Sequence, residues 1–110
     1  MIKKIYHNFI NSVNGIKCAL KEYSFIAELI LGLFLIPYIF LSNFEFNHKL
    51  FLLVLYLLLL AAELMNTAIE KLSDKITKDF DNDIKNIKDL SSASVFIVLI
   101  TLIITFFLTI

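Results

Sequence analysis

The feature that most constrains this chain is an apolar run of membrane length that continues, without a helix breaker, into a polar segment rich in carboxylates. From Leu50 to Phe80 the sequence contains no Pro and no Gly, the residues that most often bend or end a helix. We therefore expect one helix of about thirty residues that crosses a membrane and projects into water. Residues 61–92, which contain the junction, are where we expect chemistry.

Polar side chains form a stripe at this junction. Four of them follow one another at spacings of three, four and four residues: Glu63, Asn66, Glu70 and Asp74. This spacing places them within roughly 80° of one another on a single helical face. At a rise of ~1.5 Å per residue the stripe is about 16 Å long, so it runs from the apolar layer into water. A carboxylate inside an apolar span is costly unless it is paired, protonated or used. Glu63 is therefore a catalytic candidate, and a protonated structural residue is the alternative.

The composition excludes several classes of protein. Hydrophobic residues make up 59% of the 110 residues, far more than a soluble domain of this length can bury. Ten basic residues balance ten acidic ones, so no net positive field favours nucleic-acid binding. The single cysteine excludes an intrachain disulfide and a metal cluster held by several thiolates.

We predict an all-α membrane protein with one domain, residues 1–110. Residues 1–22 carry apolar side chains at spacings of three and four with Lys and Asn between them, which is typical of an amphipathic helix on a membrane surface. Residues 79–83 are expected to form a polar turn. Every lysine except Lys49 then lies on one side of the membrane, which the positive-inside rule identifies as the cytoplasm. The apolar runs predict three transmembrane spans: 24–41, 50–72 and 90–110.

Phosphate binding by a glycine-rich loop is excluded. Gly15 and Gly32 are the only glycines, and neither lies in a G-x-x-x-x-G-K context. A phosphate group would have to be held by lysine and by a metal with oxygen ligands. The chain has no arginine, so lysines would contact phosphate as point charges, without the two-pronged geometry of a guanidinium group.

Two motifs in the junction resemble the signature of a known family. They read E-L-M-N-T-A-I-E-K-L-S-D at residues 63–74 and K-D-L-S-S-A-S-V at residues 88–95, and they resemble the small bacterial integral-membrane diacylglycerol kinases and undecaprenol kinases. The resemblance implies a homotrimer in the bacterial cytoplasmic (inner) membrane, with the N-terminus and active site cytoplasmic. It also implies Mg²⁺-dependent transfer of the γ-phosphoryl group of ATP to the hydroxyl of diacylglycerol, giving phosphatidate. Phosphorylation of undecaprenol on the same scaffold is the alternative.

The resemblance also implies roles for individual residues. Glu63 would be the general base for the lipid hydroxyl, and Glu22 and Glu70 would be the Mg²⁺ ligands. Asn66 and Asp74 would support the site. The remaining contacts would be with the nucleotide (Lys88, Asp89, Asp79, Phe80, Asp81 and Lys4) and with the lipid substrate (Glu28, Ser92 and Lys49).

Some positions depart from the family pattern. Ile26 replaces an arginine that is common in the family, and Asp81 stands where a histidine is frequent. Glu28 lies where diacylglycerol-type members tend to have Glu and undecaprenol-type members His, which favours diacylglycerol. A hypothesis of another class is a non-catalytic assembly or ion-pathway subunit with a structural acidic stripe. The surface groups Glu22, Lys88 and Asp89 favour the kinase, since a packing subunit needs no metal or phosphate ligands there.

Overall fold

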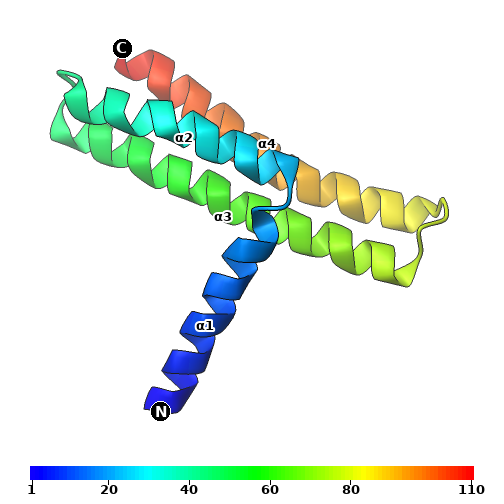
Figure 1. The fold of residues 1–110 in the computed structure, drawn as a ribbon. Coiled ribbons are helices and arrows are strands. Elements are labelled where there is room, and N and C mark those ends of the chain that lie inside the picture. The colour runs from blue at the N-terminus through cyan, green and yellow to red at the C-terminus, as the bar shows by residue number, and fades with distance from the viewer.

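The computed structural model describes residues 1–110, which form α-helices and no strands (Figure 1). The predicted all-α class is therefore confirmed. The bounds of the four helices are α1 Ile2–Ala19, α2 Tyr23–Leu41, α3 Phe46–Ile76 and α4 Asn82–Thr109.

Helices α2, α3 and α4 are each long and apolar enough to cross a membrane. α3 runs unbroken for 31 residues, as expected from a segment without Pro or Gly. Pro37 lies inside α2 and does not end it. Most large apolar side chains are exposed and only 12 of the 110 residues are buried, which suits a protein whose apolar surface faces lipid rather than water.

The predicted bounds of the last turn need correction. The break between α3 and α4 covers residues 77–81, so the turn expected at 79–83 ends earlier. α4 begins at Asn82, inside the expected turn, because Asp81 caps it. The Asp81 side chain accepts a hydrogen bond of 3.0 Å from the Ile84 backbone N–H, which satisfies one of the free donors of the first helical turn. The polar segment before Leu90 is thus the first part of α4.

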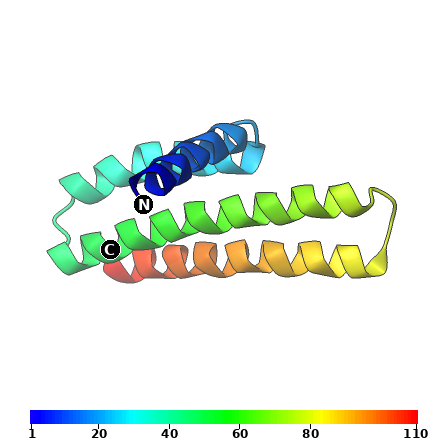
Figure 2. The same cartoon turned by 90° about the horizontal axis from the view of Figure 1, so that it is seen from below.

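α3 and α4 form an antiparallel hairpin, and α2 runs along α3 and reaches the C-terminal part of α4, where Tyr38 packs against Phe106 (Figures 1 and 2). The buried residues of α3 are spaced alternately four and three apart over much of its length, as in a coiled-coil seam. They are Leu52, Tyr56, Leu59, Glu63, Asn66 and Ser73. The first three join Ile39 of α2 and Leu102 of α4 in the apolar core. α3 is therefore the helix on which the others are assembled.

α1 leaves the other helices at the α1–α2 junction and extends away from them (Figure 1). Its apolar residues Ile2, Ile5 and Phe9 are exposed, with lysines and asparagines between them. This agrees with the predicted amphipathic helix at a membrane surface.

Candidate active site

The polar stripe on α3 divides into a buried part and an exposed part. Glu63 and Asn66 are 5% and 7% exposed, whereas Glu70 and Asp74 are open to solvent. The Asn66 side-chain N–H donates to the Glu70 carboxylate at 3.0 Å, which links the two parts. The stripe thus connects a buried carboxyl group to the water-facing end of the same helix.

A second carboxyl group from α2 lies beside Glu63. The Glu28 carboxyl lies close enough to Glu63 for the two groups to interact electrostatically, and its Oε2 atom is buried without a partner. Two carboxyl groups at such a depth repel each other unless they share a proton or bind a third group. A lipid hydroxyl is such a group, because it can donate to one carboxylate and accept from a protonated carboxyl.

Two further buried polar atoms near the stripe have no partner within the chain. They are Asn66 Oδ1 and Ser91 Oγ. Buried polar atoms of folded proteins are almost always hydrogen-bonded to protein, water or a ligand. A hydrogen-bond partner for each of these atoms would have to come from water or another molecule.

The predicted metal ligands come from two helices. Glu22 precedes α2 and forms an ion pair of 3.1 Å with Lys71, which brings Glu22 to the part of α3 that carries Glu70. No three His, Cys, Asp or Glu side chains are gathered so as to hold a metal ion. Mg²⁺, however, usually takes only one or two carboxylates and completes its shell with phosphates and water. The Glu70 carboxylate and the unpartnered Asn66 Oδ1, one helical turn away, are oxygen donors of the kind that Mg²⁺ prefers.

A polar hollow of about 260 Å³ lies at the turn between α3 and α4. Five of the predicted nucleotide contacts line it: Asp79, Phe80, Asp81, Lys88 and Asp89. Sequence reasoning missed the four other lining residues, Thr77, Ile84, Lys78 and Lys85. The density of lysines around the turn was the signal that pointed to the last two.

Ion pairs hold the lysines of this hollow in place. Lys88 donates to Asp74 across the helix pair at 2.6 Å, and Lys85 donates to Asp89 at 2.6 Å. The hydrogen bond from Lys88 lowers the pKa of the Asp74 carboxyl. Lys88 thus stands where the stripe meets the hollow.

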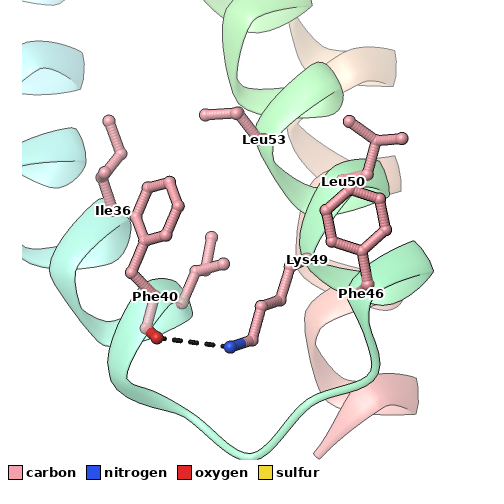
Figure 3. Close-up of a pocket in the computed structure, with 7 residues that line it drawn as sticks. Ile36, Phe40, Phe46, Lys49, Leu50 and Leu53 are labelled. Atoms are coloured by element: carbon pink, nitrogen blue, oxygen red, sulfur yellow. Dashed lines mark hydrogen bonds between the residues drawn. The ribbon is translucent and has the colours of Figure 1, made fainter.

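Two predicted contacts lie away from the stripe. Lys4 belongs to the free end of α1, far from the α3–α4 turn in both views (Figures 1 and 2). Lys49 lies near the start of α3, about 21 Å along the helix axis from Glu63. It lines an apolar hollow of about 240 Å³ and donates to the Phe40 carbonyl at 3.2 Å (Figure 3). Lys49 therefore caps the C-terminal end of α2, and the structure does not bring it together with Glu28 and Ser92.

Comparison with known proteins identifies the family. The family described as prokaryotic diacylglycerol kinase matches residues 10–110 of the chain. The chain belongs to this family. A relative from Pseudomonas aeruginosa, named diacylglycerol kinase, is 30% identical over 105 residues, covering 94% of this chain and 85% of the relative. The resemblance drawn from the two motifs is confirmed, and with its three membrane-length helices the protein is a membrane-bound lipid kinase.

Proposed function

We propose that this kinase transfers the γ-phosphoryl group of ATP to the free hydroxyl of diacylglycerol, giving phosphatidate and ADP. The observation that carries the proposal is the arrangement along α3, where buried carboxyl groups are joined by a polar stripe to a hollow with several lysines. Such an arrangement suits a reaction between a lipid, which stays in the membrane, and a nucleotide, which comes from water.

The residues of the stripe take the following parts. Glu63 accepts the proton of the lipid hydroxyl while the hydroxyl oxygen forms a bond to the γ-phosphorus. The bond between that phosphorus and the β–γ bridging oxygen breaks, and ADP leaves. Glu28, beside Glu63, helps to orient the hydroxyl. The burial of Glu63 keeps water from replacing the lipid as acceptor. Lys88 interacts with the phosphates at the water-facing end of the stripe.

Mg²⁺ is the proposed cofactor, with Glu70 and Glu22 as its protein ligands. When bound, the ion neutralises negative charge on the phosphates of the nucleotide. Lys71 pairs with Glu22 and would have to give up this pairing for the Glu22 carboxylate to hold the ion. Asn66 holds Glu70 through its amide N–H and keeps its own oxygen free for the ion or for a bound water.

The proposed active unit is a homotrimer in the bacterial cytoplasmic membrane. The positive-inside rule places the N-terminus and the lysine-lined hollow in the cytoplasm, where ATP is present. The unpartnered polar atoms of Glu28, Asn66 and Ser91 support assembly with further copies, because polar side chains promote helix packing in lipid.

The test is transfer of radiolabelled γ-phosphate from ATP in mixed micelles that contain both diacylglycerol and undecaprenol. Wild type is compared with Glu63→Gln and with the control Glu45→Gln. Glu45 is exposed at the start of α3 and makes no side-chain cap bond, so its variant should behave as wild type. Label in diacylglycerol that is lost only with Glu63→Gln supports the proposal, and label in undecaprenol alone overturns the proposed substrate. A folded wild type that labels neither lipid in the presence of Mg²⁺ refutes the proposed reaction.

A further inference from the structure

The ring of Tyr56 in α3 packs directly against Gly32 of α2. Any residue other than glycine at position 32 would prevent this close contact. A Cβ atom added at Gly32 would overlap the Oη and Cζ atoms of Tyr56. The ring is 3% exposed and belongs to the apolar core. Gly32 is itself buried. Absence of a side chain at Gly32 is therefore what admits the phenol ring to the surface of α2.

The hydroxyl of Tyr56 is bonded to the backbone of the neighbouring helix. Its Oη atom donates to the Glu28 carbonyl at 2.8 Å. In an α-helix this carbonyl already accepts the N–H of residue 32, and the tyrosine uses its second lone pair. Away from the helix ends, this is the one hydrogen bond from a side chain to the backbone that joins α2 to α3. The contact is therefore a specific link between the two helices, next to the pair formed by the Glu28 and Glu63 carboxyl groups.

The link lies at the residue that faces the proposed base. Tyr56 and Glu63 are both buried on the same seam of α3, about 10.5 Å apart along the axis. The carbonyl that Tyr56 binds is that of Glu28, whose carboxyl lies beside Glu63. Apolar packing between helices in lipid gives little resistance to sliding or rotation, since lipid chains are as apolar as the side chains. A bond to the backbone at Glu28 opposes both movements.

We propose that Tyr56 is a positioning residue that, through Gly32 and the Glu28 carbonyl, fixes the Glu28 carboxyl against Glu63 and so sets how the acceptor hydroxyl is presented. The inference rests on the proposed function, because it concerns the same pair of carboxyl groups. Its effect is on the lipid and not on the nucleotide, which approaches from the far end of the stripe.

Kinetics of two variants test the link from both sides. Tyr56→Phe retains the ring and removes only the hydrogen bond, so kcat/KM for diacylglycerol should fall about fivefold, as for loss of one neutral hydrogen bond, with KM for ATP unchanged. Gly32→Ala displaces the ring and should cause a larger fall. The control is Tyr38→Phe, because Tyr38 packs against the rings of Phe44 and Phe106, far along α2 from Glu28, and should keep the wild-type kcat/KM.

A double-variant cycle separates positioning from mere packing. If Tyr56 acts through the Glu28 carboxyl, Tyr56→Phe should cause no further loss of kcat/KM in a Glu28→Gln background, whose backbone carbonyl is intact. A role in general packing predicts instead that the two losses multiply. Multiplied losses, or a Tyr56→Phe variant with wild-type kinetics, overturn the inference.

A measurement without ATP keeps this test apart from that of the proposed function. A hydrophobic carbodiimide modifies carboxyl groups within the apolar layer, and mass spectrometry reports the modified fractions of Glu28 and Glu63. Their ratio should change in Tyr56→Phe and stay at the wild-type value in Tyr38→Phe. A changed ratio in a protein that transfers no phosphate refutes only the proposed reaction. An unchanged ratio in an active kinase refutes only the positioning role.

Discussion

The buried residues of α3 form one seam, whose first half (Leu52 to Leu59) is mainly apolar and whose second half (Glu63 to Ser73) is polar. In the first half, Leu52 and Leu59 are fully buried in the apolar core and Tyr56 donates to a backbone carbonyl. In the second half, Glu63 and Asn66 are nearly as buried, yet Asn66 Oδ1 has no partner in the chain. The polar groups of the first half are satisfied within the chain, whereas the second half holds a buried polar atom that is not. One helical face thus serves as an apolar packing surface over part of its length and carries the proposed site over the rest.

The largest effect is expected when the first polar residue of the second half is replaced by an apolar one. Glu63→Leu continues the seam with a side chain like that of Leu59. We expect the phosphoryl-transfer rate to fall about 10²–10⁴-fold, as for loss of a general base, while the free energy of unfolding rises by about 1 kcal/mol, because a buried polar group is replaced by an apolar one. Rate assays and denaturation in micelles measure the two effects. A Glu63→Leu variant that is less stable than wild type would mean that Glu63 is a structural residue.

Loss of packing in the apolar half should have the opposite result. Leu59→Ala leaves a cavity in the core around Leu52 and Leu102, and we expect the free energy of unfolding to fall by about 2–3 kcal/mol. The rate per folded molecule should stay within about twofold of wild type, since the change removes no polar group and leaves the carboxyl groups of the proposed site in place. The same two assays apply. A rate that falls as steeply as that of Glu63→Leu would show that the two halves cannot be separated.

A third prediction tests the metal-binding role proposed for the polar half, by freeing the predicted ligand Glu22 from its ion pair. Lys71→Met removes the cation that pairs with Glu22. Because partly exposed ion pairs are weak, the Mg²⁺ concentration for half-maximal rate should fall only about two- to fivefold. Lys75→Met on the same helix is the control, because Lys75 is exposed and has no ion pair. Calorimetric titration with Mg²⁺ and a non-hydrolysable ATP analogue should give the same ratio. A higher Mg²⁺ requirement would show that Glu22 is not a ligand.

The smallest effect is expected at the end of the stripe, where Lys88 pairs with Asp74. The hydrogen bond from Lys88 lowers the pKa of Asp74 from its ordinary value of 3.8. Its stabilising effect is therefore complete above that value and is lost as the pH falls through the lowered pKa of the folded state. Asp74→Asn should melt slightly below wild type at about pH 7 and about pH 5, and the difference should vanish in stronger acid.

The control for this pH series is Asp83→Asn, since Asp83 lies near the same turn but has no ion pair. The difference in melting temperature between Asp83→Asn and wild type should not change as the pH is lowered. A melting difference for Asp74→Asn that persists unchanged in strong acid would show that the Lys88 pair does not stabilise the hairpin.

The helices and the stripe were predictable because they depend on local spacing. The absence of Pro and Gly predicted the length of α3, and the spacings from Glu63 to Asp74 predicted one common face. The start of α4 was missed because Asn82 to Asp89 is polar. Asp81, a good helix-capping residue, was a signal for that start which the hydropathy pattern concealed.

Contacts between helices were not predictable, because they depend on which faces meet and at which register. Asp74 and Lys88 were each assigned a role, but their pairing requires the hairpin. The link between Tyr56 and Gly32 depends in the same way on the packing of α2 against α3. Ser92 was predicted to contact the lipid substrate, but the neighbouring Ser91 is the residue whose hydroxyl is buried without a partner. Which of the two serines is buried depends on the packing of α4.

The continuity of α3 has a consequence for the bilayer in which the kinase works. The helix runs without a break from Phe46 to Ile76, so the depth of Glu63 and the height of the hollow above the membrane cannot be adjusted separately. A thicker bilayer draws both inward and a thinner one lifts both, unless the helix tilts. The hydrocarbon thickness of the surrounding lipid thus affects how far the hydroxyl of a lipid substrate must move out of the bilayer to reach the site.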